Sequence, residues 1–91
     1  FIADIISERE RLFERLGALG IVETVWMSYA NFLLVRFENL ARVQDHLHSR
    51  RILIRDFGGQ PELANCARIT IGSRDENDAL LEALTDYEEN A

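Results

Sequence analysis

The chain has 91 residues, 47% hydrophobic and 29% charged, which fits one small globular domain or a piece of a larger one. Its formal net charge of −6 argues against nucleic-acid binding through a basic face, and no apolar run approaches the roughly 20 residues of a membrane span. All ten basic residues are arginine, so the chain lacks the lysine amine that forms a Schiff base. The single cysteine, Cys66, cannot form an internal disulfide, which favours a reducing cytoplasm.

The first half of the chain predicts a helix, two strands and a second helix. Apolar residues recur at helical spacing from Ile2 to about Leu19, and the charged residues 8–14 are expected on the solvent side. Residues 21–26 and 31–37 are rich in β-branched and aromatic side chains and predict a hairpin. Asn39 is the expected N-cap of the second helix.

The second half predicts two more strands and a third helix. Residues 51–57 and 67–72 are the expected strands, with a loop at 58–66 between them. Ser73 and Glu76 fit a capping box at the start of the last helix, and the acidic tail 86–91 is expected to fray. The order α-β-β-α-β-β-α indicates an α+β domain with a mostly antiparallel sheet and helices packed on one face.

Few side chains suggest chemistry of their own. His46 and His48 are two apart on a helix and point in different directions, so a shared metal is not expected. The carboxylates show no pairing typical of acid–base catalysis. We expect core positions for three aromatic residues and the cysteine, which are Trp26, Phe32, Phe37 and Cys66.

Two arginines interrupt apolar strands and need anionic partners. Arg55 lies in the third predicted strand and Arg68 in the fourth, and an unpaired guanidinium that is half-buried costs several kcal/mol. Spacing alone favours an internal salt bridge, with Asp56 or with a helix carboxylate. The alternative partner is an anionic ligand, since the planar guanidinium matches carboxylate or phosphate.

Three stretches of the chain resemble histidinol-phosphate aminotransferases, which are pyridoxal-phosphate enzymes of the aspartate-aminotransferase fold type. They are IISERERL, ANFLLVRF and the pattern ILIRDF..QPEL.NC.RITIGSRDEND. The resemblance runs in order over essentially the whole chain, and its RDF–QP–L–NC–RIT–G part is the most specific. It implies that residues 1–91 are the C-terminal small domain, a fragment of a longer enzyme. Gly58-Gly59 and Ala67 depart from the family pattern.

The resemblance implies that the complete enzyme has two domains with different roles. The complete enzyme would be a cytoplasmic homodimer whose large domain carries pyridoxal 5′-phosphate, while the small domain helps to close the site over the substrate. In the family, the arginines matching Arg55 and Arg68 face the phosphate of histidinol phosphate, which reacts with 2-oxoglutarate. No catalytic, cofactor-binding or metal-binding residue is expected in this chain. The isolated chain is expected neither to hold the cofactor through an imine nor to transaminate.

Two other readings remain open at the level of the sequence. The chain could be the small domain of a related aromatic aminotransferase or of an amino-acid-phosphate decarboxylase, with the same arginines holding a carboxylate. It could also be a stand-alone module that binds a small anion or mediates dimerisation. The coding sequence upstream of Phe1 would separate the enzyme readings from the module.

Overall fold

The predicted order of helices and strands is confirmed by a computed structural model, which describes the backbone of residues 2–28, 30–56 and 59–90. The elements are α1 (Ile2–Gly17), β1 (Val22–Trp26), β2 (Phe32–Phe37), α2 (Leu40–Ser49), β3 (Arg55–Asp56), a 3₁₀ turn (Pro61–Leu63), β4 (Cys66–Thr70) and α3 (Arg74–Asn90). Within these residues, no helix is long and apolar enough to cross a membrane.

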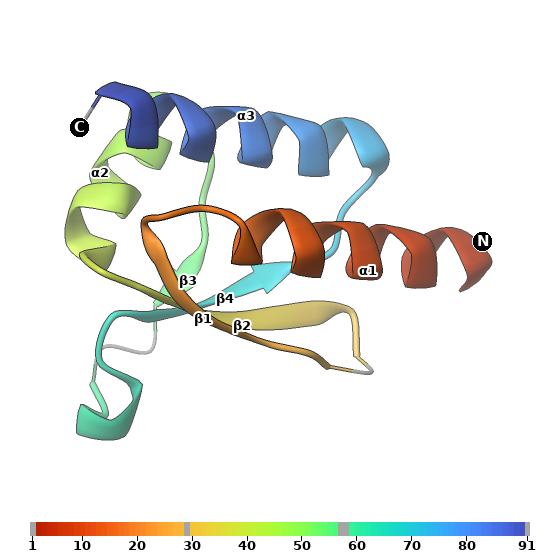
Figure 1. The fold of residues 1–91 in the computed structure, drawn as a ribbon, viewed down its shortest axis with the longest axis horizontal. Helices are drawn as coiled ribbons and strands as arrows, with labels where there is room; N and C mark the ends of the chain where they lie inside the picture. The colour runs from red at the N-terminus through yellow and green to blue at the C-terminus, as the bar shows by residue number, and fades with distance from the viewer. Residues whose placement is uncertain (1, 29, 57–58, 91) are drawn as a thin grey trace.

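The four strands form one antiparallel sheet in the spatial order β1-β2-β4-β3. The helices lie on one face of this sheet, with α1 and α3 side by side (Figure 1). Along β2, Leu33, Val35 and Phe37 are buried beneath the helices, whereas the alternate residues are only half-buried on the open face. The expected α+β class, antiparallel sheet and one-sided helix packing are therefore confirmed.

The core lies between the sheet and the helices. Cys66 and Phe37 are fully buried, as expected. Trp26 and Phe32 were expected in the core too, but both belong to the open face, where Trp26 is 39% exposed and Phe32 is half-buried. The core prediction is wrong for these two because strand alternation identifies two faces but not the one that the helices cover.

Both predicted helix caps are present. The Asn39 side-chain oxygen accepts a hydrogen bond from the backbone N–H of Arg42 at 3.2 Å. The Ser73 hydroxyl accepts from the N–H of Glu76 at 3.2 Å, and the Glu76 carboxylate accepts from the N–H of Ser73 at 2.8 Å. This reciprocal pair satisfies two donors that the first turn of α3 would otherwise leave unbonded.

The third strand is much shorter than predicted. Of the expected 51–57, only Arg55–Asp56 pairs with β4, while Phe57 lies outside the described residues. The end of α2 explains the difference. The N–H of Arg51 donates to His48 O and the N–H of Ile52 donates to Leu47 O, both at 2.9 Å, and Arg51 has a φ of 62°. These are the bonds of a Schellman turn, which directs the following residues along α2 rather than along β4.

Four other boundaries differ from the sequence-based predictions. α1 ends at Gly17 rather than near Leu19. β4 begins at Cys66 and stops at Thr70 because the backbone of Gly72 bonds the Asn77 side chain instead of a strand. The acidic tail, which was expected to fray from residue 86, is helical as far as Asn90, the last residue of α3.

The helical end of α3 is held by side-chain contacts. The amide of Asn90 donates to the backbone oxygen and to the carboxylate of Asp86, at 2.9 and 3.0 Å. The same carboxylate pairs with Arg50 of α2 and lies 3.5 Å from His46 Nε2. These contacts join the last turns of α3 to α2, which is the physical reason that the expected fraying is wrong.

Candidate functional site

The structure brings the two predicted site residues together at the edge of the sheet. Arg55 of β3 lies directly opposite Arg68 of β4 in the antiparallel register. Directly opposed residues have Cβ atoms about 4.5–5.5 Å apart and project from the same face. Long side chains that start this close together on one face can both reach a single anion.

The side chain of Arg68 is braced by an aromatic ring. Its Cζ lies 4.5 Å from the centroid of the Phe32 ring, which belongs to the neighbouring strand β2. A cation over an aromatic face is stabilised by about 0.5–1 kcal/mol at an exposed position and by more when half-buried. Phe32 therefore limits the directions in which this guanidinium can point.

No carboxylate neutralises this pair within the described residues. Every ion pair recorded there involves other arginines or His46, so the internal salt bridge considered from spacing is not seen. Asp56 is adjacent to Arg55 on β3 but points to the opposite side of the strand. Both guanidinium groups are thus available for an anion from outside the domain.

The two arginines line an open groove of about 830 Å³, which we call the arginine groove. It lies between residues 51–55, the end of β4 and the first turns of α3, and its lining includes Arg51, Leu53, Arg55, Arg68, Thr70 and Glu76. It exists because β3 is so short. Had residues 51–54 continued as a strand, they would have closed the space beside Thr70.

The edge of β4 is open in this groove. Ile71 N–H donates to Asn31 O at 2.7 Å, on the β2 side. Since successive residues of an antiparallel strand direct their backbone groups to opposite sides, those of Thr70 face the groove. β3 does not reach Thr70, so in the described structure its N–H and C=O have no strand partner there. The groove thus offers hydrogen-bonding backbone groups beside the arginines.

Charge distinguishes the arginine groove from the other hollows of the surface. It is lined by three arginines and a single carboxylate, Glu76, although the chain as a whole carries −6. The Glu76 pKa lies below its ordinary value because the N–H and the hydroxyl of Ser73 bond its carboxylate. A hollow of about 590 Å³ beside α3 has the opposite balance, with two arginines against four carboxylates. Anions are therefore favoured in the arginine groove.

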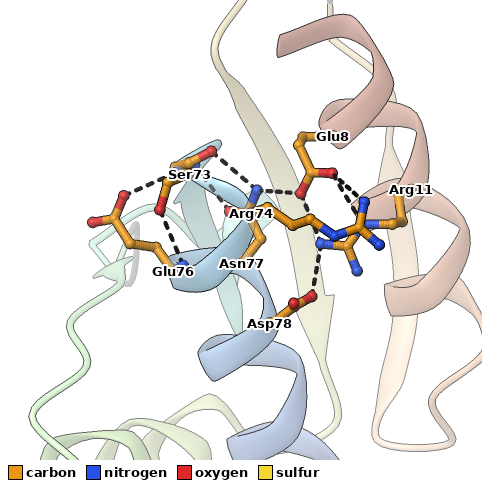
Figure 2. Close-up of polar contacts among 8 residues, drawn as sticks. Glu8, Arg11, Ser73, Arg74, Glu76, Asn77 and Asp78 are labelled. Carbon is orange, nitrogen blue, oxygen red and sulfur yellow. Dashed lines mark hydrogen bonds and ion pairs between the residues drawn. The ribbon is translucent and has the colours of Figure 1, made fainter. Parts of the chain in front are cut away.

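A polar cluster centred on the buried residues Glu8 and Asn77 lies beside the groove, and Figure 2 shows its contacts. Asn77 is 2% exposed, accepts from the N–H of Gly72 at 2.9 Å and donates to Gly72 O at 3.1 Å. Its amide also donates to the Glu8 carboxylate at 2.9 Å, across 69 positions of the sequence. The cluster ties α1 and the end of β4 to the first turn of α3, so that Glu76 and Asn77 keep their places beside the groove.

Glu8 is the centre of this cluster. Arg11 donates to its two oxygens at 2.7 and 3.1 Å and reaches Asp78 at 2.8 Å, while Arg74 lies 3.6 Å away. The hydrogen bonds from Arg11 and Asn77 lower the Glu8 pKa from 4.5 to about 2, and the bond to Glu8 raises the pKa of Arg11.

The expectation that residues 8–14 face solvent is wrong at its start, because Glu8 and Arg9 are only 7% and 9% exposed. The i,i+3 spacing of Glu8 and Arg11 was visible in the sequence. It could not reveal the packing of α1 against α3, which is what buries the pair.

The donor chemistry of the groove suits an anion and does not suit pyridoxal phosphate as a covalently held group. Arginine and backbone amides bind phosphate or carboxylate, whereas an imine with the cofactor needs a lysine, and the chain has none. Across the part of the chain that is described, no three His, Cys, Asp or Glu side chains gather as they would around a metal ion.

The class of fold is identified by solved structures. A histidinol-phosphate aminotransferase from Clostridium acetobutylicum superposes with a TM-score of 0.88 and 32% identity, over 96% of this chain and 27% of that one. An L-threonine-O-3-phosphate decarboxylase from Porphyromonas gingivalis gives a TM-score of 0.79 at 26% identity, over 92% of this chain and 27% of that one. The fold is that of the α+β small domain of aminotransferases.

The chain is also similar in sequence to histidinol-phosphate aminotransferases. The chain is 43% identical over 84 residues to the histidinol-phosphate aminotransferase of Stenotrophomonas maltophilia, which covers 92% of this chain and 23% of the relative. The resemblance to histidinol-phosphate aminotransferases is therefore confirmed, for a chain that spans less than a quarter of the relatives' length. No protein-family model matches the chain.

Proposed function

We propose that this chain is the substrate-gripping small domain of a pyridoxal-phosphate-dependent histidinol-phosphate aminotransferase of histidine biosynthesis. In that role Arg55 and Arg68 hold the phosphate of histidinol phosphate while its amino group is exchanged with 2-oxoglutarate. The observation that carries the proposal is the register of the two arginines, which are opposed across β3 and β4 at an open groove and have no ion pair with a carboxylate in the part of the chain that the structure describes. The name shared by the closely similar relatives supports the same substrate.

The geometry suits a phosphate dianion for physical reasons. Two guanidinium groups on one sheet face can each donate charge-assisted hydrogen bonds to it, and the anion removes their mutual repulsion. Phe32 limits the motion of Arg68, so less conformational freedom is lost on binding. A phosphate fixed in this way positions the rest of the substrate, and such positioning is a large source of rate enhancement.

The remaining parts of the enzyme belong to the proposal as well. The cofactor, its lysine and the reacting centre would lie in a large domain encoded outside these residues, and the complete protein would be a cytoplasmic homodimer. Pyridoxal phosphate would supply the electron sink for amine exchange. Large apolar side chains exposed on α1 and beside the sheet support a missing packing partner; they are Ile5, Ile6, Trp26, Met27 and Leu53.

The test uses the full-length polypeptide that contains this chain. Arg68→Ala and Arg55→Ala should each lower kcat/KM for histidinol phosphate by about 10- to 100-fold, as expected for the loss of a charge-assisted contact. The melting temperature should change by only a few degrees, because neither side chain has an ion pair among the described residues. Arg42→Ala, which removes an exposed arginine of α2 outside the groove, is the matched control. Equal losses of stability and activity would instead indicate structural roles.

A second candidate function is an amino-acid-phosphate decarboxylase, supported by the fold match to the Porphyromonas enzyme. The same arginines would hold the phosphate of a phosphorylated amino acid, and different chemistry would occur in the large domain. Release of CO₂ from threonine O-3-phosphate, in place of glutamate formation with histidinol phosphate, would decide for it. Turnover of phenylalanine at a comparable kcat/KM would decide for an aromatic aminotransferase.

A further inference from the structure

Arg51 stands at a backbone position that favours glycine. The Schellman turn after α2 places it at the first residue beyond the C-cap Arg50, with a φ of 62°. An L-residue other than asparagine or glycine is strained there, because its Cβ approaches the backbone. The Schellman hydrogen bonds hold the backbone in this strained conformation, so the role of the arginine side chain needs a separate explanation.

A local contribution is available but is small. The positive charge lies near the C-terminal end of α2, where it interacts favourably with the helix dipole. Arg50 already supplies a cation at that end, and it pairs with Asp86. The side chain of Arg51 has no ion pair among the described residues and lines the arginine groove together with Arg55 and Arg68. Its location thus points to the groove rather than to the helix.

We infer that Arg51 is a third anion-contacting residue, which sets the preference of the arginine groove for a doubly charged phosphate over a singly charged carboxylate. The inference rests on the proposed function of Arg55 and Arg68. Three guanidinium groups around one groove favour the ligand of higher charge, since each adds a separate attraction. Arg51 therefore combines a left-handed backbone with a place on the lining of the groove.

The first experiment separates binding from stability. The 91-residue chain, with ¹⁵N-labelled arginine Nε, is titrated with inorganic phosphate and with acetate at constant ionic strength. Arg51→Gly should weaken phosphate binding about two- to fivefold, as expected for one exposed charge pair, and change acetate binding less. Its melting temperature should rise by about 2–6 °C, because relief of the left-handed strain exceeds the lost dipole interaction.

Two control variants separate the charge of Arg51 from its backbone strain and from its place in the chain. Arg51→Gln removes the charge and keeps a Cβ, so it should reproduce the loss of phosphate binding without the gain in stability. Arg42→Ala removes the same charge elsewhere on α2 and should leave phosphate binding unchanged. Unchanged phosphate affinity in both Arg51 variants, or an equal loss in Arg42→Ala, overturns the inference.

A variant of Arg68 distinguishes this inference from the proposed anion site of Arg55 and Arg68. Arg68→Ala should weaken phosphate binding about tenfold, because that arginine is half-buried and braced. If it does so while the Arg51 variants bind phosphate like the parent, the anion site of Arg55 and Arg68 is supported and only the contact from Arg51 is refuted. If Arg68→Ala also binds like the parent, the proposed anion site itself is wrong.

Discussion

Replacing Glu8 by glutamine should expose the contribution of the buried polar cluster to stability. The substitution keeps the shape of the side chain and removes the charge that Arg11 and Asn77 surround. Those contacts lower the Glu8 pKa from 4.5 to about 2. Since a tenfold change in proton affinity corresponds to about 1.4 kcal/mol, the ionised carboxylate stabilises the folded state by about 2–3 kcal/mol after allowance for its partial exposure.

The pH dependence follows from the direction of this change. A carboxyl group whose pKa is lower in the folded state stabilises the fold fully above the pKa of the unfolded chain, near 4.5. The contribution is lost as the pH falls through the folded-state pKa of about 2, below which the group is protonated in both states. The difference in free energy of unfolding between the parent and Glu8→Gln should therefore be nearly constant from pH 5 to pH 8 and fall below about 0.5 kcal/mol near pH 2.

Urea denaturation followed by circular dichroism measures this difference at fixed ionic strength. For a domain of this size, the expected 2–3 kcal/mol corresponds to a fall in melting temperature of about 10–20 °C at pH 7. Glu10→Gln is the matched control, because Glu10 is exposed on the same helix and should change stability by less than about 0.5 kcal/mol. A parent–variant difference that is below 0.5 kcal/mol at pH 7, or equally large at pH 2 and pH 7, refutes the reasoning.

Three other substitutions test neighbouring parts of the argument. Asn77→Ala leaves both backbone groups of Gly72 unbonded and should reduce the free energy of unfolding by about 2–4 kcal/mol, so a melting temperature within 2 °C of the parent would contradict the assigned contacts. In the phosphate titration, Phe32→Leu should weaken binding by the groove about two- to fivefold, whereas Phe32→Tyr, which keeps an aromatic ring, should bind phosphate like the parent. Arg50→Ala breaks an exposed ion pair and should change stability by less than about 1 kcal/mol, against about 2–5 kcal/mol for the core substitution Leu84→Ala.

The features that could be predicted from sequence are those decided within a few residues. The caps at Asn39 and Ser73 depend on side chains that bond backbone groups three positions away, and both were found where expected. Helical and strand periodicity likewise placed α2, α3 and β2 to within one or two residues at most boundaries. The antiparallel pairing of the strands that carry Arg55 and Arg68 followed from the short connection between them, whereas their register is known only from the structure.

The features that were missed depend on competition between distant or alternative partners. Residues 52–54 have side chains typical of a strand. The Schellman turn at Arg51 sets the direction of the chain there, and these residues do not pair with β4. Glu8 looks like an exposed charge until Asn77 of α3 is known to contact it. In both cases local pattern and tertiary packing disagree, and packing prevails.

The short β3 also leaves the domain with an unprotected strand edge. The backbone of Thr70 faces open space, and an exposed edge of this kind can pair with a strand of another molecule. Arg51, Arg55 and Arg68 surround that edge, and clustered like charges discourage such pairing between copies of the chain. Besides the binding role that we propose for them, these arginines would thus oppose self-association, and removing several of them together would promote it. Each single variant should be checked by light scattering before a lost affinity is attributed to the ligand.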